Sequence, residues 1–426
     1  MDIQSLAIIA GGLLLFSLIS GRLRDTIITA PLVFVGFGLV VGSSGVGVAH
    51  IDPGHGMIHF IAECTLILVL FTDAARIKLG DVRIDHNLPQ RMLVLGLPLT
   101  MLCGALVAVW LFPAFSLWEA ALLAALLAPT DAALGQSVVS AKAVPARIRQ
   151  AINIESGLND GIALPAVLLF ASLAGAAHGT QNDASMWVQF GLMQLVLGPI
   201  VGIIIGATGA VALDRAVVCG WMGDSYQGIA ILALAILIYV AAELIGGNGF
   251  IAVFIGGMVF GNRLQNACTF LFEFMETEGQ LLMLITFLIF GAVMLPQALE
   301  HAGVEHLVYA LLSLTVVRML PILLSLIATG VRLPTQLFLG WFGPRGLASV
   351  LFLLLIIEES DLPQRDEIFT VTVLTVTLSA LLHGVSAAPL ANAYARLAAG
   401  MGECEENMPA VEIPLREGHI IETKQG

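Results

Sequence analysis

The sequence contains few charged residues. Asp, Glu, Lys and Arg make up only 12% of its 426 residues, whereas a soluble domain carries about 25%. Hydrophobic residues make up 58%, and windows of about 20 apolar residues, long enough to cross a ~30 Å hydrocarbon core, recur along the whole chain. This composition excludes a soluble fold and predicts an all-α polytopic membrane protein. In such a protein the net charge of −13 does not indicate binding to nucleic acid or to a soluble partner.

The sequence also lacks the patterns of metal sites and disulfide frameworks. Its five cysteines are scattered, without CxxC spacing, so neither a zinc site nor a set of disulfides is indicated. No nucleophile and base stand at the spacing of a catalytic pair. We therefore expect no enzymatic activity and no cofactor.

Thirteen segments are predicted to cross the membrane, each apolar over most of its length. In chain order they are 4–20, 28–49, 57–75, 92–112, 117–136, 152–176, 187–213, 226–245, 248–262, 278–297, 304–330, 335–358 and 367–395.

The basic residues predict the orientation of these spans, because loops rich in Lys and Arg stay on the cytoplasmic side. All but three of the 18 Lys and Arg residues fall in alternate loops or in the C-terminal tail. The exceptions are Arg318 and Arg345, inside spans, and Arg365, in a loop of the opposite set. This bias predicts an integral protein of the cell (inner) membrane with the N-terminus outside and the C-terminus in the cytoplasm. The tail at 397–426 is acidic and interrupted by proline, and we expect it to be short and flexible.

An internal symmetry appears when span seven is treated as a linker. Spans one to six then enter from outside and spans eight to thirteen from inside, as in two inverted six-helix repeats. The corresponding spans five and twelve contain Pro129 and Pro344, each beside a charged residue, Asp131 or Arg345. Proline removes a backbone donor and clashes with the preceding turn, so helices five and twelve are predicted to be broken. Paired breaks at equivalent positions indicate the binding site of a transporter.

Span six contains the densest group of polar residues in an apolar surrounding. On a helix Glu155 and Asn159 lie one turn apart, and Ser156 and Asp160 form the adjacent row, so the four side chains make one polar stripe. A carboxylate at the centre of a bilayer costs roughly 2.5–3.5 kcal/mol. These side chains therefore need partners, and the stripe is predicted to be a functional site inside the bundle.

The charges at the two breaks suggest those partners. We expect Glu155 to pair with Arg345, because a buried guanidinium needs a carboxylate, and Asp160 then remains to exchange ligands. Such a cluster of hard oxygen donors suits a hard monovalent or divalent cation. The further oxygen donors expected there are Asp131, the carbonyl of Thr130, and Ser156.

Other polar residues receive plainer interpretations. Asp73 ends span three near the cytoplasmic mouth, where a solvated helix-end carboxylate and a residue of the cation pathway both remain open. Arg318, near the middle of span eleven, is expected to bind a helix end or a carboxylate. His59 and His383 are lone histidines, and neither is assigned a proton-sensing role.

Three motifs together carry a family resemblance. They are Ala128-Pro129-Thr130-Asp131 in span five, Glu155-Ser156-Gly157-Leu158-Asn159-Asp160-Gly161 in span six and Gly343-Pro344-Arg345-Gly346 in span twelve. In residues and order they resemble the monovalent cation:proton antiporters, in the branch of NhaP and the eukaryotic sodium/proton exchangers. The resemblance implies that Asp160 exchanges cation and proton. It further implies that Asp131, Thr130 and Ser156 help to hold Na+, that Glu155, Asn159 and Arg345 form a structural polar network, and that Asp73 matches an acidic position on the ion path of some members.

The resemblance also implies an assembly. It predicts a homodimer in a lipid bilayer, with a transmembrane antiporter domain at 1–396. Within it a core domain (about 92–176 and 304–395) would move against a dimerisation domain (about 1–75 and 187–297).

Functions of different classes remain open. The first is a secondary antiporter that exchanges Na+ (or Li+, or K+) for H+ by alternating access. Because residue 159 is Asn and not a second Asp, this exchange is expected to be electroneutral, one for one. The second is a cation channel, which would need rings of repeated oxygens that the sequence lacks. An organic-anion carrier on a related fold would have fewer carboxylates at mid-membrane.

Overall fold

The fold is described from a computed structural model. It describes residues 3–23, 29–42, 44–47, 55–77, 87–131, 134–139, 141–178, 184–265, 269–359, 362–402 and 404–407, and within these ranges every regular element is a helix. The α-helices are α1 (Ile3–Leu23), α2 (Ala30–Val41), α3 (His55–Arg76), α5 (Asn87–Arg91), α6 (Leu97–Leu111), α7 (Leu117–Leu126), α8 (Gln136–Val139), α9 (Ala146–His178), α10 (Ala184–Val218), α11 (Asp224–Leu244), α12 (Gly249–Arg263), α13 (Thr269–Ile289), α14 (Leu295–Glu300), α15 (Val304–Leu314), α16 (Val316–Ser325), α17 (Leu333–Trp341), α18 (Leu347–Glu359) and α19 (Arg365–Ala399). Two π-helical turns, Met92–Gly96 and Phe290–Met294, lead into α6 and α14, and Glu405–Asn407 is a 3₁₀ turn.

The lengths of these helices agree with a membrane protein. Among the described residues, 8 helical segments are long and apolar enough to cross a bilayer. Shorter apolar helices include α2, α7, α12 and the first part of α18, and two of these, α7 and α18, are short because each adjoins a predicted break. The all-helical membrane class is thus confirmed, while the count of 13 spans and the two inverted repeats stay predictions.

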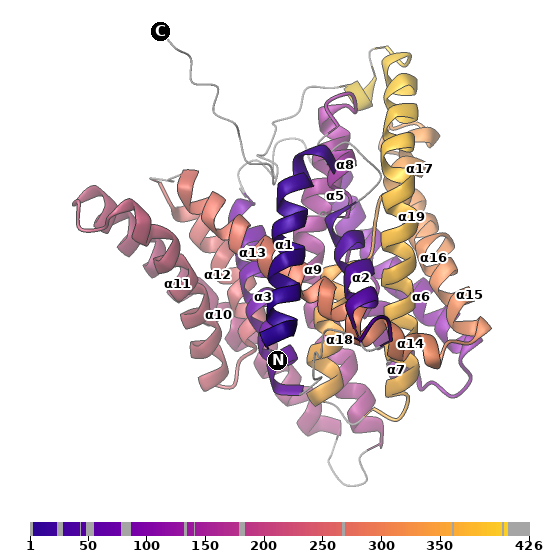
Figure 1. Ribbon diagram of the computed structural model, residues 1–426, viewed down its shortest axis with the longest axis horizontal. Coiled ribbons are helices and arrows are strands. Elements are labelled where there is room, and N and C mark those ends of the chain that lie inside the picture. The colour runs from indigo at the N-terminus through magenta and orange to yellow at the C-terminus, as the bar shows by residue number, and fades with distance from the viewer. Residues whose placement is uncertain are drawn as a thin grey trace.

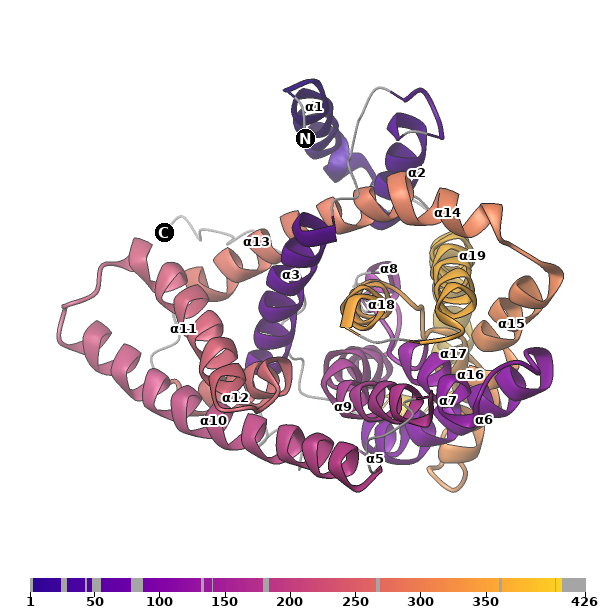
Figure 2. The ribbon, with the colours of Figure 1, turned by 90° about the horizontal axis from the view of Figure 1, so that it is seen from below.

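The helices form two groups, which Figure 1 shows from the side and Figure 2 from below. In one group α10 packs along α12 and α12 along α3, with α11 and α13 beside them. In the other, α6 packs on α7, α7 on α9, and α15 and α18 on α19. Small residues allow close packing in the first group, since a Cβ on Gly202 or Gly206 of α10 would collide with carbonyl oxygens of α12. Helix α3 also contacts α9 and α18, so it lies at the boundary between the groups.

One interruption was not predicted. Residues 304–330 were expected to form a single span, but the helix is interrupted at Thr315, whose φ of −110° and ψ of −94° are not helical. Helix α16 therefore starts anew at Val316, and Arg318 lies in its first turn.

The start of the tail also differs from the prediction of a flexible segment. Helix α19 continues to Ala399, and the turn that follows is packed against the bundle. Arg147, near the start of α9, donates to the backbone oxygen of Glu405 at 2.6 Å and pairs with its carboxylate at 2.5 Å. Glu406 Oε1 accepts hydrogen bonds from the Arg332 N–H at 2.7 Å and from Thr335 Oγ1 at 3.0 Å. The prediction for 408–426 concerns a range outside the described residues.

Candidate functional site

The first helix break follows α7. This helix begins with a capping box, in which Ser116 Oγ accepts the Glu119 N–H and Glu119 Oε2 accepts the Ser116 N–H. It ends at Leu126, and residues 127–131 are not helical. Pro129 has no N–H with which to continue the helix. The break predicted in span five is confirmed.

The second break separates α17 from α18. Helix α17 ends at Trp341, residues 342–346 are not helical, and α18 begins at Leu347. Pro344 lies in the middle of this segment and again removes a backbone donor. The break predicted in span twelve is confirmed as well.

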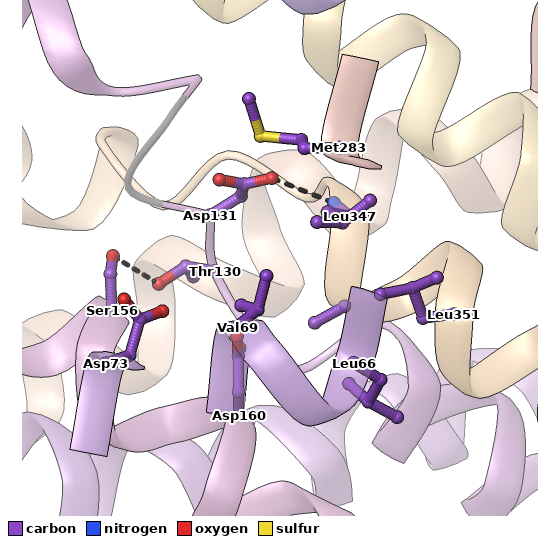
Figure 3. Close-up of a pocket in the computed structure, with 11 residues that line it drawn as sticks. Leu66, Val69, Asp73, Thr130, Asp131, Ser156, Asp160, Met283, Leu347 and Leu351 are labelled. Carbon is purple, nitrogen blue, oxygen red and sulfur yellow. Dashed lines mark hydrogen bonds between the residues drawn. The ribbon is translucent and has the colours of Figure 1, made fainter. Parts of the chain in front are cut away.

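The two breaks cross, and each supplies hydrogen-bond partners for polar groups of the other. The Asp131 N–H donates to Pro344 O at 2.7 Å, and the Leu347 N–H donates to Asp131 Oδ2 at 2.8 Å, the bond dashed in Figure 3. In the opposite direction Arg345 Nη1 donates to the carbonyl oxygens of residues 128–129. A carboxylate therefore lies at the N-terminus of α18 and a guanidinium just beyond the C-terminus of α7, each opposite in sign to the partial charge of that helix end. Unwound backbone inside a membrane protein needs such partners.

Side chains of the polar stripe on α9 form hydrogen bonds with the first break. Ser156 Oγ lies 3.0 Å from Thr130 Oγ1, and Asn159 Nδ2 donates to the same hydroxyl at 2.5 Å. All three side chains are buried. The predicted proximity of this stripe to Thr130 is confirmed, although the structure uses the hydroxyl of Thr130 for the contact and the prediction used its carbonyl.

The predicted partner of Glu155 was wrong. Its two carboxylate oxygens accept hydrogen bonds from Arg318, at 2.7 Å from Nη1 and 2.8 Å from Nη2, and both side chains are fully buried. Arg345 is engaged instead with the carbonyls of the first break. The planar fork of Arg318 matches both oxygens of a carboxylate, and Gly343 makes room for it, because a Cβ there would overlap Arg318 Nε. The expectation that Arg318 binds a carboxylate or a helix end is confirmed.

A small cavity lies where these elements meet (Figure 3). Its polar wall consists of Asp73, Thr130, Asp131, Ser156 and Asp160. Its apolar wall comes from α3, α13 and α18, through Leu66, Val69, Met283, Leu347, Ala348 and Leu351. The cavity therefore has walls from both helix groups. In the described part of the chain, no three His, Cys, Asp or Glu side chains are close enough to form a metal cluster.

The structure thus brings together the residues expected to bind the ion, Asp160, Asp131, Thr130 and Ser156, and adds Asp73, for which the sequence left two interpretations open. It also shows a contact that the sequence reasoning missed. The Arg345 N–H donates to Ser379 Oγ on α19 at 2.6 Å. One indication of this contact was present in the sequence: Ser379 and His383 are polar residues four positions apart in an apolar span, so they would lie on one helix face.

The comparisons with known proteins agree with this geometry. The family model described as "Sodium/hydrogen exchanger, transmembrane" matches residues 8–393. The chain belongs to the sodium/hydrogen exchanger family. Among solved structures, the sodium proton antiporter MjNhaP1 from Methanocaldococcus jannaschii is similar with a TM-score of 0.75 and 21% identity, over 92% of this chain and 98% of that one. This likeness shows that the fold is the one of that antiporter.

Three curated antiporters are also similar to this chain in sequence. The K(+)/H(+) antiporter NhaP of Alkalimonas amylolytica is 28% identical over 92% of this chain and 67% of its own length. The K(+)/H(+) antiporter NhaP2 of Shewanella sp. (strain ANA-3) is 25% identical over 89% of this chain and 64% of its own length. A Na(+)/H(+) antiporter of Schizosaccharomyces pombe is 27% identical over 80% of this chain and 77% of its own length. The chain thus spans about two thirds of the length of the two bacterial relatives.

Proposed function

We propose that this protein is a secondary active antiporter that exchanges a monovalent cation for H+ across the membrane. The observation that carries the proposal is the cavity at the crossing breaks, where Asp160 and Asp131 share a wall with the hydroxyls of Thr130 and Ser156. These are hard oxygen donors, which suit an alkali cation better than a soft metal. A channel would need several oxygen sites in line, and this cavity supplies a single group of donors.

Exchange follows from competition at one carboxylate. We assign that role to Asp160, because it lines the cavity next to Thr130 and Ser156. When protonated, its carboxyl is a poor cation ligand, and when ionised it balances the charge of the cation. Cation and proton therefore exclude each other, and the apparent cation affinity falls as pH drops.

The neighbours of Asp160 favour one proton for one cation. Glu155 is occupied by Arg318, residue 159 is an amide, and the Asp131 carboxylate accepts the first N–H of α18. Each of these three neighbours thus has a partner or a chemistry of its own, which leaves Asp160 as the carboxylate proposed to exchange proton and cation. We propose electroneutral exchange on this ground.

Alternating access would come from movement between the two helix groups. The cavity has α3 and α13 on one side and α9 and α18 on the other, so a shift of one group would open it to one face of the membrane and then to the other. We propose that α6–α9 and α15–α19 form the moving core domain and that the other group forms a homodimer interface. The proposed orientation in the cell membrane is N-terminus outside and C-terminus in the cytoplasm.

The transported ion is proposed to be Na+ or Li+, with K+ as the alternative. The same oxygens coordinate all three ions, and selectivity depends on the size and rigidity of the cavity. The curated relatives include proteins named for K+ and one named for Na+.

The test is proton movement in proteoliposomes. With an imposed pH gradient, Na+, Li+, K+ and choline are added in turn, and exchange appears as collapse of the gradient with an alkali cation but not with choline. Asp160→Asn should abolish this response, whereas Asp366→Asn, the same change at an exposed site on α19, should retain it. Substantial exchange by the Asp160→Asn protein would overturn the assignment.

A further inference from the structure

Helix α19 carries two polar side chains beside the second break. Ser379 and His383 are four residues apart, so they lie on one face of this 35-residue helix. Both are almost completely buried, with exposures of 0% and 1%. Buried polar groups need hydrogen-bond partners, and these two find them at Trp341, just before the break, and at Arg345, within it.

The contacts reach from the residue before the break to a residue near its end. His383 Nε2 lies 2.9 Å from the carbonyl oxygen of Trp341, the last residue of α17. Ser379 Oγ accepts the N–H of Arg345 at 2.6 Å, and Arg345 lies three residues after Phe342, the C-cap residue of α17. The two side chains contact each other, with 3.1 Å between Ser379 Oγ and His383 Nδ1.

His383 Nε2 faces the carbonyl oxygen of Trp341 at 2.9 Å, and Nδ1 faces both the hydroxyl and the carbonyl oxygen of Ser379, at 3.1 and 3.0 Å. In the neutral tautomer that carries its proton on Nε2, Nε2 donates to Trp341 O and Nδ1 is an acceptor. Ser379 accepts from the Arg345 N–H and can then donate its own hydroxyl proton to Nδ1. An imidazolium would instead direct Nδ1–H to the Ser379 carbonyl, 3.0 Å away, and would add a positive charge near buried Arg345 and Arg318.

We propose that Ser379 and His383 are positioning residues that fix the geometry of the second break and, through it, the cation site. They hold the backbone at Trp341 and Arg345, so that the Arg345 guanidinium reaches the carbonyls of the first break and the Leu347 N–H reaches Asp131. Residues Ser156 and Asn159 of α9 do the same for the first break through Thr130. Each break is thus held by one polar pair on a long neighbouring helix, and rigid helices position a site more accurately than loops do. The inference rests on the proposed function of the cavity.

The experiment compares variants that remove or retain each hydrogen bond. Ser379→Ala and His383→Leu remove them. Ser379→Thr retains a hydroxyl, and His383→Gln retains a donor that reaches about as far as Nε2. Ser325→Ala is the matched control, because Ser325 is equally buried but its hydroxyl only donates to Ile322 O within its own helix.

Two quantities are measured for each purified protein. The first is the cation concentration that gives half-maximal exchange in proteoliposomes. The second is the rise in thermal unfolding temperature caused by saturating Na+ or K+, which reports binding without transport. We expect Ser379→Ala and His383→Leu to raise the half-saturating concentration roughly three- to tenfold, the usual effect of one lost hydrogen bond, and to reduce the cation-induced thermal shift. Ser379→Thr and His383→Gln should recover much of both quantities.

The outcomes separate this inference from the proposed function. A wild-type protein without cation-driven proton movement overturns the proposed function. Exchange by the wild type, together with half-saturation and thermal shift in Ser379→Ala equal to those of Ser325→Ala, overturns the positioning role alone. A lower unfolding temperature with an unchanged cation-induced shift would make the pair merely structural and would also overturn it. If His383→Leu does not fold, the two serine variants decide.

Discussion

Glu155 of α9 and Arg318 of α16, 163 positions apart in the chain, form a buried ion pair with two parallel hydrogen bonds. The pair lies beside both helix breaks, since Glu155 adjoins Ser156 of the cavity and Arg318 passes over Gly343. Both oxygens of the Glu155 carboxylate are engaged in this pair, and Asp160 is the carboxylate of the polar stripe that lines the cavity.

The first prediction concerns this pair. Arg318→Met and Glu155→Leu should each destabilise the protein by about 3–5 kcal/mol, because each leaves a buried charge without its partner, whereas the double variant should be milder. The measurement is unfolding in mixed micelles, arranged as a double-mutant cycle. A second cycle with Glu155→Leu and Arg345→Met should give a smaller coupling, since Arg345 binds backbone carbonyls. Equal coupling in both cycles would contradict the pairing.

The second prediction concerns the contact between Gly346 and Asp131. A Cβ at position 346 would overlap the Asp131 carboxylate, so Gly346→Ala should displace that carboxylate from the N-terminus of α18. We expect a loss of about 1–3 kcal/mol of stability, as in other overpacked sites, and a weaker apparent cation affinity. Gly175→Ala on α9 is the control, because nothing lies within 4 Å of a Cβ there. Normal cation affinity in Gly346→Ala would show that the cavity does not depend on this close approach.

The third prediction concerns Glu406, which completes the N-terminus of α17. In α7 the carboxylate of Glu119, at the third helical position, accepts the N–H of the cap residue. Helix α17 has Thr335 at that position, and the carboxylate that accepts the N–H of its cap residue is that of Glu406, in the turn after α19. Burial alone would raise the pKa of Glu406. The hydrogen bonds from Arg332, Cys404, its own backbone and Thr335 outweigh burial and leave this pKa below its usual value.

A lowered folded-state pKa gives a defined pH dependence. The stabilisation by Glu406 is complete above the unfolded-state pKa of about 4.3 and is lost as pH falls through the folded-state value. Glu406→Gln should therefore lower stability at neutral pH by about 1.5–3 kcal/mol, the usual range for a hydrogen bond to a charged group, and the difference should shrink below about pH 4. Thermal unfolding across pH measures this, with Glu300→Gln at an exposed helix end as control. A difference from wild type that persists at low pH would show that the charge of Glu406 is not involved.

The fourth prediction concerns charge movement. If Asp160 is the single exchanging carboxylate, one proton moves for one cation, and the rate and end point of exchange should not depend on membrane potential. Cation-driven proton flux is measured with and without a K+/valinomycin voltage clamp, using Na+ as the transported ion. Asn159→Asp is an informative companion, because it removes the donor to Thr130 and adds a second carboxylate. Voltage-dependent exchange by the wild type would indicate that Asp131 or another group also titrates.

Local chemistry explains which predictions succeeded. The membrane class follows from composition, and the two breaks follow from Pro129 and Pro344, since a proline inside a helix disturbs its own turn whatever surrounds it. The polar stripe of Ser156, Asn159 and Asp160 follows from helical spacing alone. These features depend on residues within one or two turns of each other, and a sequence displays such neighbours directly.

The partners across the bundle were decided only by tertiary structure. Arg318 and Arg345 are both buried guanidiniums beside helix irregularities, and nothing in their own segments distinguishes which of them meets Glu155. The interruption at Thr315 and the lack of a side chain at Gly343 allow Arg318 to reach the Glu155 carboxylate. The crossing of the two breaks instead brings Arg345 to the carbonyl oxygens of residues 128–129. The contacts of Ser379 and His383 could not be predicted for the same reason, because the partners of these side chains are Trp341 and Arg345 and do not belong to their own helix. By itself the sequence determined where the helices break and which polar residues share a helix face. The packing of helices distant in the chain decided how those residues pair, because a buried charge takes whichever partner the fold brings within hydrogen-bonding distance.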